Sequence, residues 1–195
     1  MENIAKDLLV EKGHVKAEVL LNYAHYIERK EGKEGLKRVE DRMAELGASV
    51  SLGGSRNVQW MRVGINSLLL LVCKEQFQWT EKDIRDMGYV TSKISFITRM
   101  LVRFFVSREK VLKEANRHWR KYFDFGSLEA VDHGDNYAVI EIKGYKGHPL
   151  NCHLFAGYIH GISELISKDN KNITVEEIKC IHKGDDGHRF KTTWN

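Results

Sequence analysis

Four side chains in the last quarter of the sequence are of the types that bind metal ions: Cys152, Glu177, Cys180 and His188. The last three follow the spacing E-x-x-C-x7-H. Thiolate, imidazole and carboxylate groups all bind zinc, and four of them complete a closed tetrahedral site that holds no water. The residue types alone leave two interpretations open. One is a structural zinc ion, and the other is two separate buried thiols with Glu177 and His188 in solvent.

The strand that carries Glu177 and Cys180 must be irregular if both are to bind one ion. Apolar residues alternate along this segment, and the parity of the alternation changes between Val175 and Ile178. In a regular strand Glu177 and Cys180 would point to opposite faces of the sheet. We therefore expect a β-bulge between Val175 and Ile178.

The other two candidate ligands depend on a turn and on a helix. Gly184 marks a tight connection, and a hairpin centred there would place Cys180 opposite His188, with their Cβ atoms about 5 Å apart. Cys152 opens an apolar helix, whose N-terminus is expected to favour its thiolate form.

The same segment carries a longer motif, C-x4-G-Y-x2-G followed by E-x-x-C-x3-G-x3-[CH]-x-F. Its residues are Cys152, Gly157, Tyr158, Gly161, Glu177, Cys180, Gly184, His188 and Phe190. The motif resembles that of the 4-vinyl reductase domain family, which includes the ligand-sensing domains of phenol- and xylene-responsive activators. That family is related in fold to haem nitric-oxide-binding domains and to small subunits of the TRAPP tethering complex. The resemblance implies a zinc ion beside an aromatic-ligand pocket, with His188 standing where the activators have cysteine.

Length and composition predict one soluble globular domain. The chain has 195 residues, which suits a single domain 1–195 with a helical subdomain 1–125 and a zinc-containing subdomain 126–195. The longest apolar run, Leu68 to Cys73, is too short to span a membrane, and no signal peptide is visible. Three cysteines without a secretion signal indicate a reducing, cytoplasmic location. A net charge of +4 does not require a nucleic-acid partner.

Hydrophobic periodicity predicts an α+β fold. The expected helices cover residues 1–12, 15–30, 36–46, 58–78, 80–87, 91–106, 107–122 and 151–167. The expected strands include 128–133 and 137–143, which flank Gly134-Asp135, and a last hairpin in which Phe190, Thr192 and Trp194 share a face. An N-terminal helical part would pack on a four-stranded antiparallel sheet, built from a C-terminal β-hairpin–helix–β-hairpin unit. Gly157 and Gly161 would let the helix approach this sheet closely.

Aromatic side chains are available to line an apolar chamber of the kind found in the related sensors. The candidates are Trp60, Phe96, Phe104, Trp119, Phe155 and Tyr158, with Phe77 and Trp79 as further choices. Regularly spaced aromatic residues are also common in ordinary hydrophobic cores. Each candidate therefore has a second interpretation, as a core residue. The spacing of residues 80–106 imitates a DNA-binding helix-turn-helix, but its second helix is apolar enough to belong to the core.

The leading hypothesis is a small-molecule sensor that binds an apolar or aromatic ligand, contains structural zinc, and signals through a protein partner or a homodimer. A second hypothesis is an accessory enzyme for reduction of a tetrapyrrole vinyl group, although no flavin or dinucleotide fingerprint is visible. A third is a haem-based gas sensor. Nine histidines offer axial ligands, but the Y-x-S-x-R motif of such sensors is absent. A fourth is a scaffold like the TRAPP small subunits.

Overall fold

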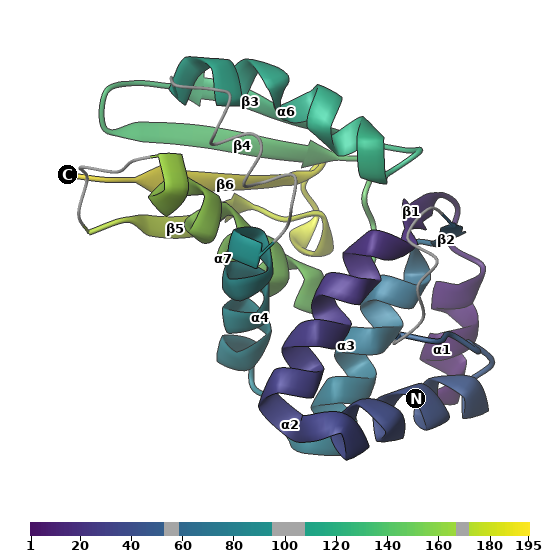
Figure 1. Ribbon diagram of the computed structural model, residues 1–195. Coiled ribbons are helices and arrows are strands. Elements are labelled where there is room, and N and C mark those ends of the chain that lie inside the picture. Colours follow the sequence, from purple (N-terminus) through teal and green to yellow (C-terminus); the bar gives the residue numbers. More distant parts are fainter. Residues whose placement is uncertain (53–58, 95–107, 167–171) are drawn as a thin grey trace.

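The computed structural model describes residues 1–52, 59–94, 108–166 and 172–195, and it joins a helical part to a sheet (Figure 1). The helices are α1 (Glu2–Leu9), α2 (Ala17–Glu45), α3 (Gly64–Phe77), α4 (Glu81–Ile94), α6 (Arg108–Tyr122) and α7 (Leu150–Ile166). The strands are β1 (His14–Lys16), β2 (Trp60–Arg62), β3 (Ser127–His133), β4 (Tyr137–Lys143), β5 (Thr174–Lys179) and β6 (His188–Thr193). The α+β class predicted from the sequence is confirmed.

The main sheet has four antiparallel strands in the order β3-β4-β6-β5. The strands come from two β-hairpin units with α7 between them in sequence, as predicted, and β4 and β6 pair at the centre. A separate two-stranded sheet joins β1 to β2. Within the described ranges, no helix combines the length and the apolar character needed to cross a membrane.

The helix break predicted near Gly32 is confirmed. The helices expected over 15–30 and 36–46 are the two halves of α2, and a kink separates them at Gly32, where φ is 76° and ψ is 175°. The break expected at Gly88 does not occur, because α4 continues through it. A Cβ atom at Gly88 would lie 2.0 Å from the carbonyl oxygen of Leu154. Gly88 is therefore a point of close contact with α7 and not the end of a helix.

Gly157 and Gly161, on α7, lie at the same close contact between α4 and α7. A Cβ atom at Gly157 would lie 1.9 Å from the carbonyl oxygen of Arg85, and one at Gly161 would lie 2.0 Å from the hydroxyl of Ser92. Arg85 and Ser92 belong to α4, so the prediction that these glycines approach the sheet is wrong. The glycines bring two helices close together, and the bulkier residues of α7 contact the sheet.

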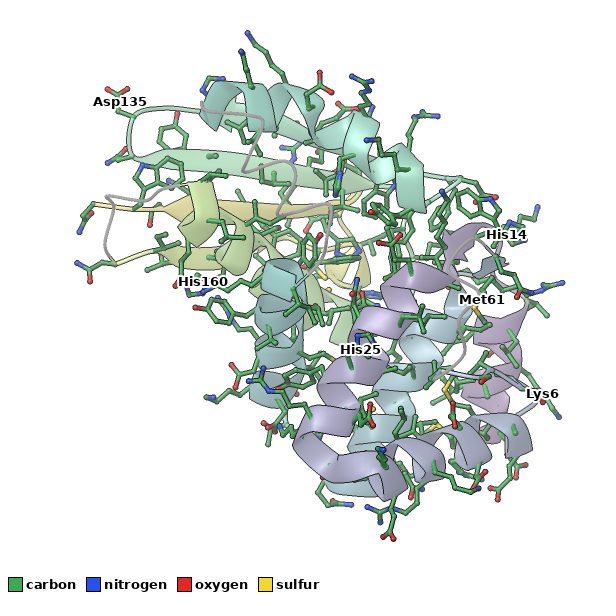
Figure 2. The ribbon with its side chains drawn as sticks, in the orientation of Figure 1. Lys6, His14, His25, Met61, Asp135 and His160 are labelled. Carbon is green, nitrogen blue, oxygen red and sulfur yellow. The ribbon has the colours of Figure 1, made fainter. Side chains whose placement is uncertain are left out.

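The hydrophobic core has two parts. One lies among α1, α2, α3 and α4 around the buried run Leu68–Cys73. The other lies between α6, α7 and the inner face of the sheet, where Ile140, Ile142 and Phe190 are buried. Figure 2 shows side chains filling both regions, with His14 and His25 among the exposed residues. The alternation predicted for the last strand is confirmed, since Phe190, Thr192 and Trp194 are all buried.

Candidate metal centre and ligand cavity

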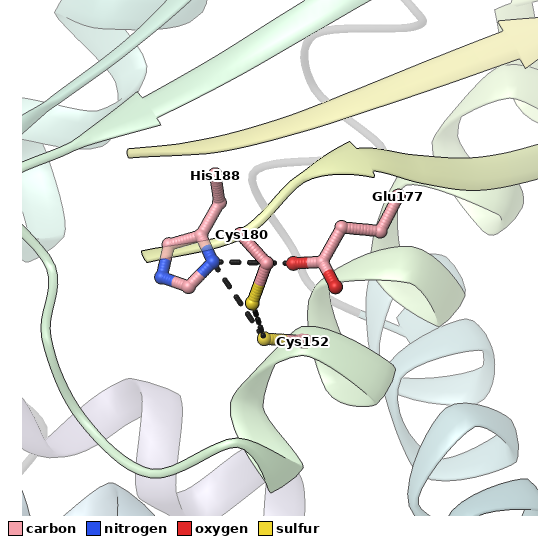
Figure 3. A group of neighbouring side chains, drawn as sticks. All are labelled: Cys152, Glu177, Cys180 and His188. Atoms are coloured by element: carbon pink, nitrogen blue, oxygen red, sulfur yellow. Dashed lines mark hydrogen bonds and ion pairs between the residues drawn. The ribbon is translucent and has the colours of Figure 1, made fainter. Parts of the chain in front are cut away.

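The structure brings the four predicted metal ligands together at one end of the sheet (Figure 3). One ligand atom from each of Cys152, Glu177, Cys180 and His188 lies within 4.8 Å of all the others. The sulfur of Cys152 is 3.6 Å from the sulfur of Cys180 and 3.6 Å from Nδ1 of His188. Nδ1 of His188 is 3.2 Å from Oε1 of Glu177.

These separations match a tetrahedral metal site. Zinc bonds of about 2.0–2.3 Å at tetrahedral angles separate neighbouring ligand atoms by roughly 3.3–3.8 Å. A disulfide would instead hold two sulfur atoms about 2.05 Å apart. The Cys152 and Cys180 sulfurs, at 3.6 Å, therefore have the spacing of two ligands of one ion.

The expected β-bulge is present and explains why Glu177 and Cys180 converge. The pairing of β5 with β6 shifts between Glu177 and Lys179, which leaves Ile178 as the extra residue. Ile178 is exposed, whereas Cys180 is 3% exposed. The extra residue turns Cys180 back toward the face that carries Glu177.

The connection to β6 is a helical turn, not the tight hairpin expected at Gly184. Cys180 precedes the 3-10 helix Ile181–Lys183, and Gly184 ends it with φ at 95°. The carboxylate of Asp185 accepts a 2.8 Å hydrogen bond from the backbone N–H of Cys180. The turn returns the chain to His188, the first residue of β6, which pairs with Ile142 on β4.

The ring of His188 is held in the orientation that a metal ligand needs. Its Nε2 lies 3.2 Å from the carbonyl oxygen of Tyr145, an acceptor that fixes the ring proton on Nε2. Nδ1 then keeps its lone pair and faces Cys152 and Glu177. Metal-binding histidines commonly donate their second N–H in this way.

Burial makes the cluster costly without a cation. Cys152 is 6% exposed, Cys180 3% and His188 0%. Burial raises the pKa of the Cys152 thiol strongly, and the adjacent Glu177 carboxylate raises that pKa further. The thiolate stabilisation expected from the N-terminus of α7 is therefore outweighed. A divalent cation would reverse the balance, because a coordinated thiol loses its proton outright.

An apolar cavity of about 160 Å³ lies on the same face of the sheet, between α2, α4, α6 and α7. Its described walls include Val111 and Trp119 of α6, Phe155 and Ile159 of α7, and Ile140 of β4. Phe155 also contacts the metal cluster, since its ring centroid is 6.5 Å from that of His188. The cavity and the cluster are therefore neighbours across one aromatic ring.

The six predicted ligand-binding residues have different positions. Trp119, Phe155 and Tyr158 line the cavity. Phe96 and Phe104 lie outside the described residues. Trp60 is not at the cavity: it lies on β2, is 42% exposed, and has the ammonium of Lys16 5.5 Å from its ring centroid. Because β2 pairs with β1 in the separate two-stranded sheet, Trp60 lies away from the core beside the four-stranded sheet.

Of the two further candidates, neither is among the described cavity walls. Trp79 is buried in the helical core, where its indole N–H donates a 2.8 Å hydrogen bond to Glu31. Phe77 packs partly buried against the same core.

Two residues that the sequence analysis did not single out line the cavity on α6. Nδ1 of His118 and the hydroxyl of Tyr122 are buried and have no hydrogen-bond partner within the described part of the chain. Burial lowers the pKa of His118 to about 4, so the imidazole is neutral at pH 7. The sequence feature from which these two residues could have been identified is their i, i+4 spacing on an amphipathic helix.

Solved structures with a similar fold include H-NOX proteins. The H-NOX protein from S. oneidensis, in the Fe(II)NO ligation state, matches with a TM-score of 0.67 and 11% identity over 92% of this chain and 99% of that one. The Fe(II) unliganded H-NOX protein from K. algicida matches with a TM-score of 0.64 and 14% identity over 92% and 96%. A third structure, determined to probe haem distortion in the H-NOX family, gives a TM-score of 0.64 at 12% identity.

At these identities the likeness establishes an H-NOX-like fold and no more. No family model matches the chain. No curated protein matches it either. The relationship to haem nitric-oxide-binding domains expected from the sequence is thus confirmed at the level of fold, whereas the 4-vinyl reductase resemblance gains no support from these comparisons.

The described cavity does not fit a haem. His118 is the single imidazole among the described lining residues, and no lysine or arginine is present there to pair with the two propionates. The volume of about 160 Å³ is close to that of an engineered cavity of about 150 Å³ that binds benzene. The described walls therefore suit one small ring and not a macrocycle.

Proposed function

We propose that this chain is a sensor domain that binds a small apolar or aromatic molecule in the cavity and carries a structural zinc ion at Cys152, Glu177, Cys180 and His188. The observation that carries the proposal is the convergence of four ligand atoms to within 4.8 Å of one another, one aromatic ring away from an apolar cavity. Zinc is favoured because two thiolates and one imidazole suit a borderline-soft ion, whereas magnesium and calcium favour oxygen ligands.

The zinc ion would act as a clamp. Four protein ligands leave no open position for water, so the ion is structural and not catalytic. It would tie the first turn of α7, at Cys152, to the connection between β5 and β6. The wall of the cavity that α7 provides would then be fixed relative to the sheet.

A haem-based gas sensor is the second candidate. The similarity in fold to H-NOX structures favours this alternative over the apolar-ligand sensor. The chemistry of the described cavity, with no cation and little volume, favours the apolar ligand. Titration of the purified protein with haem separates the two, because a saturable Soret band at one haem per chain would support the gas sensor.

Membership of the 4-vinyl reductase family remains part of the proposal and rests on the motif from Cys152 to Phe190. The proposal also includes signalling through a homodimer or a separate protein partner. Light scattering at micromolar concentration tests the homodimer, and a monomer throughout that range would contradict it.

The ligand proposal is tested by thermal stabilisation. A ligand that binds only the folded state raises the melting temperature in proportion to the logarithm of its concentration above Kd. We expect small single-ring compounds to stabilise the protein and haem to have no effect. Absence of stabilisation by any apolar compound would contradict the sensor.

A further inference from the structure

Two polar atoms face a cavity whose walls are otherwise almost entirely apolar. Nδ1 of His118 and the hydroxyl oxygen of Tyr122 are both buried, and neither has a hydrogen-bond partner among the residues that the structure describes. Tyr122 as a whole is only 8% exposed. Buried polar atoms in folded proteins are nearly always hydrogen-bonded, because leaving one unpaired is costly. Two such atoms in one cavity indicate that a bound molecule supplies the partner.

The two polar groups belong to neighbouring rings on one helix. They lie one helical turn apart on the face of α6 that lines the cavity. Their rings pack edge to face with centroids 5.3 Å apart. A hydroxyl group that enters the cavity beside α6 can therefore reach both.

Two other polar groups on the cavity wall have partners within the protein. The indole N–H of Trp119 donates to the carbonyl oxygen of Phe125 at 2.7 Å. The hydroxyl of Thr91 donates to the carbonyl oxygen of Met87 on its own helix at 2.8 Å. These groups shape the cavity but have no need of a ligand.

The charge of the wall restricts the ligand further. The described lining residues include no lysine, arginine, aspartate or glutamate. A carboxylate or an ammonium in this cavity would lose its hydration without gaining an opposite charge. Burial lowers the pKa of His118 to about 4 and raises the pKa of Tyr122, so both groups are neutral at pH 7. A neutral imidazole nitrogen can accept a hydrogen bond, and the phenol can donate one.

We propose that His118 and Tyr122 form a polar anchor that selects a neutral, one-ring ligand bearing a hydroxyl group. The hydroxyl donates a hydrogen bond to Nδ1 of His118 and accepts one from the Tyr122 hydroxyl, while the ring fills the apolar remainder of the cavity. This inference rests on the proposed sensor function and adds the chemical class of its ligand. A site that hydrogen-bonds a ligand hydroxyl discriminates strongly against an analogue that lacks it.

Calorimetry with three probes of similar size tests the anchor: benzyl alcohol, ethylbenzene and benzoate. We expect wild-type protein to bind benzyl alcohol about tenfold more tightly than ethylbenzene, and to bind benzoate far more weakly than either. Tyr122→Phe and His118→Leu should each reduce the preference for the alcohol to about twofold or less while leaving ethylbenzene binding nearly unchanged. Thr91→Val is the matched control, because the Thr91 hydroxyl is already bonded within α4, and it should keep the full preference.

The outcomes separate the anchor from the sensor. Equal binding of benzyl alcohol and ethylbenzene by wild-type protein would overturn the anchor and leave the apolar cavity as a ligand site. Tighter binding of benzoate would overturn it as well, since the wall would then have to hold a cation. Failure of all three probes to bind folded, zinc-loaded wild-type protein would contradict the sensor itself. Melting curves and zinc content of each variant establish that it is folded.

Discussion

The cluster of four candidate metal ligands and the cavity lie on the same face of one sheet and share α7. They differ in whether their buried polar atoms have partners within the protein. In the cluster each ligand atom faces another, at 3.2–3.6 Å along the chain of contacts from Glu177 through His188 and Cys152 to Cys180. In the cavity two polar atoms face no described partner. Ligand atoms that converge on one point are suited to an ion held by the protein alone. Polar atoms without a partner in the protein are suited to an exchangeable small-molecule ligand.

Phe155 is the boundary between the two regions. Its ring lies 5.0 Å from that of Tyr145, and its centroid is 6.5 Å from those of His188 and Phe190. The other side of Phe155 lines the cavity. Tyr145 also accepts the hydrogen bond from His188 through its carbonyl oxygen. A change in either region therefore reaches the other through a few contacts.

Replacing one metal ligand should have the largest effect. Cys180→Ser is expected to lose the zinc and to lower the melting temperature by about 10 °C or more, because zinc binding contributes to folding. Cys73→Ser is the matched control: Cys73 is also a fully buried thiol, but it lies in the helical core. It should destabilise the protein and keep one zinc per chain. Equal zinc content in both variants would contradict the metal centre.

Adding a methyl group at the shared helix should disturb both regions together. In Gly157→Ala the new Cβ would lie 1.9 Å from the carbonyl oxygen of Arg85, so α7 must move away from α4. We expect a loss of about 3 kcal/mol in the free energy of unfolding, with weaker zinc and ligand binding, as measured by denaturant titration and calorimetry.

Gly32→Ala is the comparison for this variant. It has no atom within 4 Å of the added Cβ and suffers only the strain of its φ of 76°. It should cost about 2 kcal/mol, because residues other than glycine rarely adopt φ 76° together with ψ 175°, and it should leave both sites intact. If Gly157→Ala were no worse than Gly32→Ala, the close contact between α4 and α7 would be refuted.

Replacing Phe155 with a smaller residue should change the cavity and leave the metal site unchanged. Phe155→Leu removes part of the cavity wall and is expected to cost about 2 kcal/mol in stability while zinc is retained. The enlarged cavity should accept a substituted ring that the wild-type protein binds weakly, as measured by calorimetry. Phe77→Leu, in the helical core, should cost a similar amount and leave ligand selection unchanged. The same selection in both variants would show that Phe155 does not bound the cavity.

A substitution on the opposite face of the sheet should have the smallest effect on stability, and this effect should depend on pH. The carboxylate of Glu141 is 2% exposed and pairs with Arg189 and Lys143. Burial alone would raise its pKa, but the hydrogen bonds from Lys143 and Arg189 outweigh burial and lower it. A lowered pKa means that the ionised carboxylate stabilises the folded state above its unfolded pKa of about 4. This contribution disappears as the pH falls through the folded pKa.

Glu141→Gln should therefore cost about 1 kcal/mol at pH 7 and less at pH 3. The quantity to measure is the difference in unfolding free energy between wild type and variant across this range, because loss of zinc in acid affects both proteins. A difference that stays constant or grows toward pH 3 would contradict the lowered pKa.

The sequence predicted the sheet and the metal cluster because both depend on local patterns. The turn at Gly134-Asp135 and the alternation of Phe190, Thr192 and Trp194 each involve a few neighbouring residues. The convergence of Glu177 and Cys180 needed one bulge, and the break in apolar alternation revealed it. The sequence thus named the four side chains that the structure brings together.

Features that depend on distant contacts were not predictable in this way. Gly88 resembled a helix end, and only its contact with Leu154, 66 positions away, explains why the helix continues. Trp60 resembled a pocket residue, but its strand pairs at the edge of the helical part. The missing partners of His118 and Tyr122 are a property of the assembled cavity, which no spacing in the sequence reveals.

Metal analysis and an absorbance spectrum of the untreated, chelator-free protein distinguish a zinc-containing sensor from a haem protein. We expect one zinc per chain, released in parallel with unfolding, no Soret band in the protein as purified, and only the broad absorbance of free haem after haem is added. A protein with less than stoichiometric zinc would contradict the metal centre. A Soret band with one iron per chain would replace the apolar-ligand sensor with a haem-based one.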